Sequence, residues 1–357
     1  MDILLQILQA ISFLFHGILK NLAIGGIPIL MMMRYRSANG DAQAYYRTLA
    51  QDMGRLMPMV LGLAVVFGLM NWAVVRWQYE WTLLPIWGSS LISWLGLLLL
   101  LVIGFGGMVW LRRAHAETPG LQWMIACLVI ICMILIAGLF VSSHINMPML
   151  SNSAGNDERL VESAALLSTF WPRLLHTVCS GLAITGVALA IYGSLRPQSR
   201  EDHQKDPAPY DIRLVRFGVG WALAGTVPQV VVGPWFMLAL PAQVRVHLIE
   251  GTSVVSLIFF LSLTLTLLSL VLLNSSLMIP QKRGLVWGGV GSLILTTVLM
   301  VLIREEVRNV WLLSLGERIH AAPLSWPVVI VVLGIAGAGL YLGCRCVTLS
   351  HKAVATR

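Results

Sequence analysis

Long apolar segments recur along the whole chain, and each is closed by charged residues or proline. Many exceed the roughly 18 to 20 residues that a helix needs to cross the hydrocarbon core of a bilayer. Because lipid offers no partner to exposed backbone groups, we expect these segments to be α-helices. The sequence therefore predicts an all-α, polytopic transmembrane bundle. Nine spans are expected, near 9–33, 54–76, 87–111, 121–147, 169–194, 214–240, 254–274, 285–304 and 325–347.

The chain offers no stretch outside these spans that is long enough to fold alone. With 57% hydrophobic and 11% charged residues, it is far more apolar than a soluble domain. The first segment carries polar residues and has no small-residue cleavage site, so we expect a retained helix rather than a signal peptide. We expect three parts: a five-helix membrane half (1–196) with the candidate haem histidines, a cytoplasmic linker (197–213), and a four-helix half (214–357).

Lys and Arg concentrate in alternate loops, which predicts the orientation of the chain. The loop 151–163 is instead acidic, with Asp157, Glu158 and Glu162 against Arg159. The N-terminus is therefore expected outside and the C-terminus inside. The net charge of +8 follows from this topology, so we expect no nucleic-acid partner. The inner basic residues are Arg34, Arg36, Arg47, Arg55, Arg112, Arg113, Arg196, Arg200, Lys205, Arg213, Lys282, Arg283, Arg345, Lys352 and Arg357.

Three histidines lie within the predicted spans: His16, His144 and His176. An ionisable residue at membrane depth is a candidate for function, because leaving it in hydrocarbon is costly. The predicted topology places all three in the outer half of the bilayer. Imidazole is a common haem-iron ligand. The alternative for each is a histidine that only hydrogen-bonds a neighbouring helix.

Small and cationic residues accompany two of these histidines. Lys20 follows His16 by one helical turn, and Arg173 precedes His176 by one turn. Either cation suits a haem propionate or a quinone oxygen, although Lys20 alternatively snorkels to the interface. Small side chains would let a flat macrocycle approach the backbone; those nearby are Gly17, Gly25, Gly26, Ser180, Gly181 and Gly186.

Two segments resemble a known family. The segment RLLHTVCSGLAITGVALAIYG (173–193) resembles the helix of cytochrome bd quinol oxidase subunit I whose histidine ligates the low-spin haem b. The segment LFHGILKNLAIGGIPILMMMRYR (14–36) resembles the first helix of that family, whose histidine ligates a haem of the oxygen-reducing pair, and SSHINMPML (142–150) occupies the place of its fourth-helix end. The resemblance covers roughly residues 10–240. It implies that His176 ligates haem b and that His16 ligates a second haem.

The chain also departs from those oxidases. The segment 92–110 has no acidic residue where the family has glutamates, PAQVRVHLIEGTS (241–253) stands in place of the long quinol loop, and the C-terminal oxidase signature is absent. We therefore do not expect oxygen reduction. The chain instead resembles shortened, cytochrome bd-like proteins found beside c-type cytochromes. Their charged motif resembles IREEVRNVWL (303–312), which suits proton release from quinol or cytochrome docking; the alternative is a solvated helix end.

These observations predict a haem b subunit, with one or two haems, of a respiratory complex in the bacterial inner membrane. It would oxidise quinol and pass electrons to an external c-type cytochrome, as a quinol dehydrogenase subunit. No C-x-x-C-H motif occurs, so covalently attached haem is not expected. The alternatives are a cofactor-free anchor for a redox partner and, less favoured, a small-solute transporter. The second axial ligand is open among Met237, Met300, His144 and His247.

Overall fold

The computed structural model describes residues 2–39, 42–78, 91–113, 119–150, 158–196, 210–279, 281–314 and 326–355. Within these ranges the regular elements are all helices, and no strand occurs. The all-α prediction is therefore confirmed. The helices are α1 (Asp2–Asn39), α2 (Gln43–Gln78), α4 (Leu91–Arg113), α5 (Pro119–Leu150), α6 (Glu158–Leu195), α8 (Ile212–Thr226), α9 (Gln229–Ala239), α10 (Ala242–Ile249), α11 (Val254–Met278), α12 (Arg283–Ser314) and α13 (Trp326–Ala355).

The described helices make the chain a multi-pass membrane protein. Seven spans are long and apolar enough to cross a bilayer: α1, α2, α4, α6, α8 together with α9, α11 and α12. The two other predicted spans fall on α5 and α13, whose described apolar stretches, Gly120–Ile136 and Trp326–Ala338, are shorter. The total of nine therefore stays a prediction.

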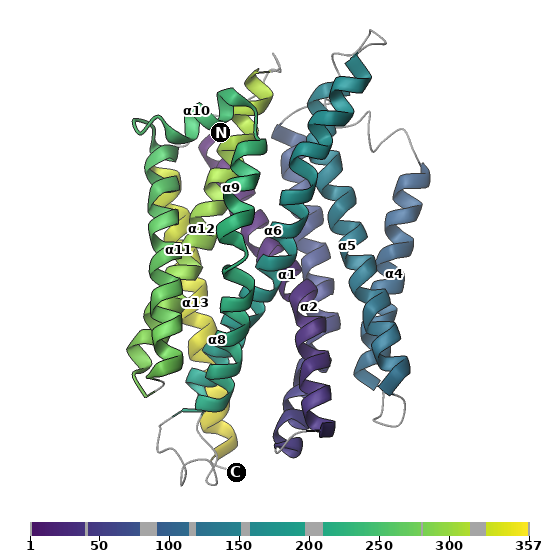
Figure 1. Ribbon diagram of the computed structural model, residues 1–357, viewed down its shortest axis with the longest axis vertical. Coiled ribbons are helices and arrows are strands. Elements are labelled where there is room, and N and C mark those ends of the chain that lie inside the picture. Colours follow the sequence, from purple (N-terminus) through teal and green to yellow (C-terminus); the bar gives the residue numbers. More distant parts are fainter. Residues whose placement is uncertain are drawn as a thin grey trace.

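The helices run up and down along one axis, and the two termini lie at opposite ends of the bundle (Figure 1). The short helix α10 lies across the end that holds the N-terminus. We call this the N-terminal end and the opposite one the C-terminal end. On one side are α8 to α13, on the other α2, α4 and α5, with α1 and α6 passing between them.

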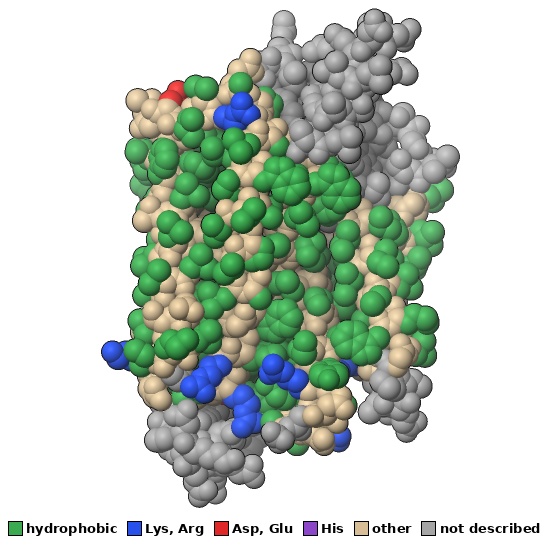
Figure 2. Space-filling view, in the orientation of Figure 1, with side chains coloured by type: hydrophobic (Ala, Val, Ile, Leu, Met, Phe, Trp, Pro, Cys, Tyr) green, Lys and Arg blue, Asp and Glu red, His purple; other side chains and the backbone are tan. Residues whose placement is uncertain are grey.

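Apolar side chains cover the middle of the bundle, and Lys and Arg gather at the C-terminal end (Figure 2). On α4, for example, Leu98, Leu99 and Val102 are each more than half exposed, as lipid-facing side chains should be. The positive-inside rule would put the C-terminal end in the cytoplasm. That orientation agrees with the predicted one, which stays a prediction.

Small residues bring the backbones of α6 and α8 into contact. A Cβ on Gly218 would lie 2.5 Å from the Ala190 nitrogen, and one on Gly193 would lie 2.9 Å from the Val215 nitrogen. Gly186 and Gly225 face the opposite backbone in the same way. Close approach through small residues is the common mode of helix packing in membranes, where apolar burial gives no preference for protein over lipid.

The sixth predicted span is broken in the middle, as its proline indicates. Helix α8 ends at Thr226 and α9 begins at Gln229, with Pro228 between them. Proline lacks the N–H that would continue the helical bonds, so nearby carbonyls need other donors. The Gln229 side chain donates to the Gly225 carbonyl at 3.0 Å and accepts from the Ser180 hydroxyl at 3.3 Å. The break is thus tied to α6.

Asp211 organises the C-terminal end of the bundle. Its Oδ1 accepts from the Leu214 backbone N–H at 3.0 Å and caps α8, while the Tyr45 hydroxyl donates to its Oδ2 at 2.7 Å. Arg283 donates to the Ser194 carbonyl at 2.7 Å. These bonds join α2, α6, α8 and α12 where the two predicted halves meet. Most of the predicted linker, 197–209, lies outside the described residues.

Candidate functional site

Helices α1 and α6 form the scaffold of the site. Both start at the N-terminal end and run in the same direction (Figure 1). They touch backbone to backbone, because a Cβ on Gly181 would lie 3.1 Å from the Gly25 nitrogen. The structure thus gives Gly25 and Gly181 a helix-packing role, in place of the macrocycle contact that their position suggested.

All four candidate residues lie on the N-terminal side of this crossing. They form two pairs, and the two members of each pair lie at similar distances from it. Lys20 precedes Gly25 by five residues, and His176 precedes Gly181 by the same number. At about 1.5 Å per residue, both lie about 7.5 Å along the helix from the crossing. His16 and Arg173 precede it by nine and eight residues. The predicted candidates on α1 and α6 are therefore brought together.

The imidazole of His16 is oriented by α2. Its Nδ1 lies 2.8 Å from the Ala64 carbonyl oxygen. Because a carbonyl only accepts, Nδ1 carries the proton and Nε2 keeps its lone pair. Metal-binding histidines are commonly fixed in this way by their second nitrogen. Gly68 leaves room for the ring, since a Cβ there would lie 2.8 Å from His16 Nδ1.

His176 lies in the interior of the same region. Its Nδ1 is buried and has no hydrogen-bond partner within the described part of the chain. An unsatisfied buried nitrogen costs about 1–3 kcal/mol, which a metal ion or a hydrogen-bonding ligand would offset. Lys20 lies within electrostatic range of the imidazoles of both His16 and His176. The two rings and the ammonium thus form one group.

Positive charge accumulates beside the histidines. Arg304 of α12 lies within electrostatic range of both Lys20 and Arg173. Its guanidinium lies 3.6 Å from the centre of the Phe13 ring, and that of Arg173 lies 4.9 Å from the Phe236 ring. Three half-buried cations from α1, α6 and α12 therefore lie in one region, and Arg304 is already paired with Glu305. Such a group favours an anionic ligand such as a carboxylate.

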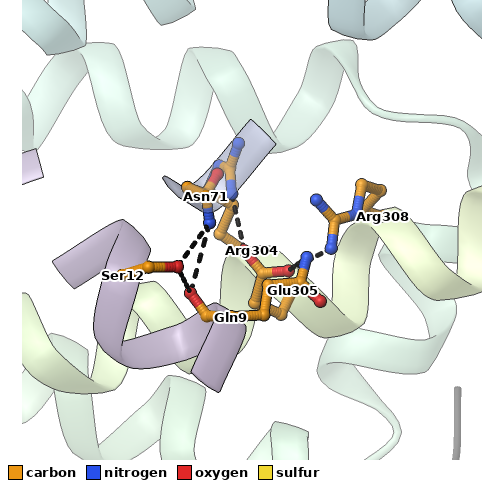
Figure 3. A network of polar contacts seen from close by, with 6 residues as sticks. All are labelled: Gln9, Ser12, Asn71, Arg304, Glu305 and Arg308. Atoms are coloured by element: carbon orange, nitrogen blue, oxygen red, sulfur yellow. Dashed lines mark hydrogen bonds and ion pairs between the residues drawn. The ribbon is translucent and has the colours of Figure 1, made fainter. Parts of the chain in front are cut away.

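A polar network closes the site toward the N-terminal end (Figure 3). Glu305 accepts from Arg304 at 2.6 Å, from Gln9 at 2.5 Å and from Arg308. On the other side of Gln9, the Asn71 amide donates to the Gln9 carbonyl at 3.3 Å and to the Ser12 hydroxyl at 3.1 Å. Helices α1, α2 and α12 are thus joined by buried polar groups.

This network shows that one alternative for the charged motif is wrong, and it adds residues to the predicted site. The side chains of Glu305 and Glu306 are only 13% and 9% exposed, so the motif 303–312 is not a solvated helix end. Gln9, Ser12 and Asn71 were not among the predicted site residues. The sequence could have indicated these residues, because polar side chains within apolar spans need partners.

The sequence matches no described protein family and no curated protein. The fold does have a counterpart among solved structures. A bd oxidase from Geobacillus thermodenitrificans superimposes with a TM-score of 0.63 at 12% sequence identity, over 99% of this chain and 97% of that one. This chain has a bd oxidase-like fold. At this identity the likeness establishes the fold, and the site residues must be argued from their own geometry.

Within the bd oxidase-like fold, the short segment after α9 is ordered. It forms α10, and the turn to α11 contains Gly251 with φ of +80°, a conformation that favours glycine. His247 of α10 lies 3.3 Å from Glu306, Nε2 to Oε1, and 3.6 Å from Glu250, Nδ1 to Oε1. Because both ring nitrogens face carboxylates, His247 is not a candidate axial ligand of a haem. Met300 is half-buried against the apolar cluster around Leu14.

The remaining candidate ligands stay open. His144 lies in α5 by its backbone, and its side chain is outside the described residues. Met237 is half-buried on α9. The residues present on α1 and α6 fit a haem: one imidazole has its Nε2 free, another has an orphaned buried nitrogen, and nearby cations suit propionates.

Proposed function

We propose that this protein is the haem b subunit of a respiratory electron-transfer complex in the bacterial inner membrane. It oxidises quinol and passes the electrons to an external c-type cytochrome. The observation that carries the proposal is the hydrogen bond of His16 to Ala64, which prepares Nε2 as a ligand in the same region as the buried Nδ1 of His176. The bd oxidase-like fold supports the same conclusion, since that neighbour is an oxidase.

Each residue of the group has a role in this proposal. His176 ligates haem b and His16 ligates a second haem, with His144 as a further candidate ligand. Lys20 and Arg173 hold propionates or a quinone oxygen, and Arg304 adds to the positive field around them. When bound, haem b supplies a one-electron carrier. The apolar helices around the group exclude water and raise the strength of these electrostatic contacts.

The location of the site fits transfer to an outer acceptor. His16 and His176 lie between the helix crossing and the N-terminal end, which the positive-inside rule would place outside. Quinol loses two electrons and two protons on oxidation. Protons released at that end leave on the outer side, where the cytochrome docks. Oxygen reduction is not proposed, because α4 carries no acidic residue.

The test is a reduced-minus-oxidised optical spectrum of the purified protein, together with a pyridine haemochrome count of haem per chain. We expect a b-type α-band that is lost in His176→Ala and diminished in His16→Ala. Cys179→Ala is the matched control, because this half-buried side chain lies one turn from His176 on the same helix. Haem-free wild-type protein would contradict the proposal and favour a cofactor-free anchor.

A further inference from the structure

Three ionisable side chains lead from the interior to the surface at the N-terminal end. Glu306 Oε1 lies 3.3 Å from His247 Nε2, and His247 Nδ1 lies 3.6 Å from Glu250 Oε1. Their side chains are 9%, 29% and 38% exposed, in that order. Contact with solvent therefore rises along the series. The imidazole stands between two carboxylates, one buried and one at the surface.

A small pocket lies at the inner end of this series, lined by both polar and apolar side chains. Glu306 lines a depression between α1, α12 and α13 together with Glu305, Gln6, Gln9 and Asn309. Glu305 already accepts bonds from three donors, two of them arginines. Glu306 instead faces an imidazole that can change its protonation state. Of the two acids, Glu306 is the one in contact with a histidine.

The histidine is held in place through its backbone. Its carbonyl accepts from the Ser256 hydroxyl at 2.9 Å and from the Ser253 hydroxyl at 3.4 Å, both at the start of α11. Val244 and Leu248 of α10 are buried and anchor the helix to the bundle. Because the backbone makes the anchoring contacts, both ring nitrogens remain available to the carboxylates.

The charged groups around His247 leave the two acids as its ionisable partners in the described structure. From its own helix, Arg245 is directed elsewhere and donates to the carbonyls of Leu238 and Leu240 at 2.6 and 3.1 Å. On α12, Arg304 and Arg308 bond Glu305. The contacts from α11 are serine hydroxyls. The imidazole therefore lies between two carboxylates, one at each ring nitrogen.

We propose that Glu306, His247 and Glu250 form a proton-exit relay from this pocket to the medium. The proposal rests on the quinol oxidation proposed above and adds the route of its protons. As quinol is oxidised, its O–H bond breaks, the proton passes to the Glu306 carboxylate, and the electrons pass to the external cytochrome. Glu306 then protonates His247 at Nε2. Release of the Nδ1 proton to Glu250 and water leaves the imidazole protonated at Nε2. Exchange of the imidazole back to its Nδ1–H tautomer then prepares it for the second proton.

The relay is tested with the purified full-length protein, a short-chain quinol as donor and ferricyanide as acceptor. A positioned acid–base group contributes about 10²–10⁴-fold, so His247→Gln and Glu306→Gln should slow turnover at least about tenfold. Glu250→Gln should cost less, because its exposed position admits water. Asp52→Asn is the control, since this exposed acid pairs with Arg55 elsewhere on the chain. The dithionite-reduced spectrum and haem count should not change.

Chemical rescue separates proton transfer from a structural role. Added imidazole should restore turnover of His247→Gly, because a free base can occupy the space and carry the proton; a packing defect would not respond. Wild-type turnover in His247→Gln, or no rescue with haem intact, would overturn the relay and leave the proposed function standing.

A second readout does not depend on haem. If wild-type protein has neither haem nor turnover, the proposed function is wrong. The relay is then tested separately by infrared titration of the carboxylic acids. The carboxylic-acid band that Glu306→Gln removes should respond to the pH of the medium, and that response should change in His247→Gln. An identical response in both proteins would overturn the coupling between the two groups.

Discussion

The contact between α1 and α6 makes a quantitative prediction at Gly25. A methyl group there would lie 2.7 Å from the Leu182 nitrogen and closer still to the Gly181 carbonyl. The obstacle is backbone, which cannot move aside as a flexible side chain can. Gly25→Ala must therefore separate the two helices. Overpacking of this kind costs about 1–3 kcal/mol, and we expect the upper part of that range.

The control is Gly17→Ala on the same helix, where a methyl group would meet nothing within 4 Å. Both substitutions gain up to about 1 kcal/mol from the better helix propensity of alanine. The difference between the two variants therefore isolates the steric term. Unfolding entropy is about 2.1 cal/mol/K per residue, so 1 kcal/mol corresponds to about 1.3 °C in a chain of 357 residues, and Gly25→Ala should melt about 3–4 °C below Gly17→Ala.

The assay is thermal unfolding of both variants in one detergent at one scan rate, because unfolding of a membrane protein is often irreversible. A haem count before heating shows whether the helix shift also disturbs the site. Equal melting temperatures for the two variants would refute the backbone contact, and with it the matched levels of the four candidate residues.

Three further substitutions test other parts of the structure. Glu305→Gln should cost about 1–3 kcal/mol, because it weakens charge-assisted bonds from the half-buried Arg304 and Arg308, whereas the exposed Asp52→Asn should cost less than about 1 kcal/mol; thermal unfolding compares them. Gly68→Ala should alter the optical spectrum by displacing the His16 ring, while Gly62→Ala, which meets nothing within 4 Å, should leave it unchanged. Asp211→Ala should lower the free energy of unfolding by about 1–3 kcal/mol, because it removes a helix cap and the acceptor of Tyr45; a melting temperature within error of wild type would contradict the cap.

The positions of the helices were predictable because one rule governs them. Backbone groups in lipid must bond within a helix, so the length of each apolar segment nearly determines its structure. The break in the sixth span has a similarly local cause, since Pro228 removes a hydrogen bond at a known position. The extent of the helices was less accurate: α1 and α6 each have 38 residues and extend well beyond their apolar centres.

The site was predicted in part. Burial of ionisable residues singled out His16, His176, Lys20 and Arg173, and the structure places them together. Their common level depends on where α1 and α6 cross, which no local pattern specifies. The partnership of Gln9 with Glu305 spans 296 positions, so it also required the folded chain. The contact between His247 and Glu306 could not be predicted either, because the two residues lie on different helices.

That long separation affects how the protein is made. Polar side chains enter the membrane with α1, before the helix that supplies Glu305 exists. Translation proceeds at about 5–20 residues per second, so the 296 positions between Gln9 and Glu305 take about 15–60 s to synthesise. Asn71 arrives much earlier and provides the Gln9 carbonyl with a donor in the meantime. The nascent α1 therefore depends first on α2, and the charged half of the network can form only when α12 has been inserted.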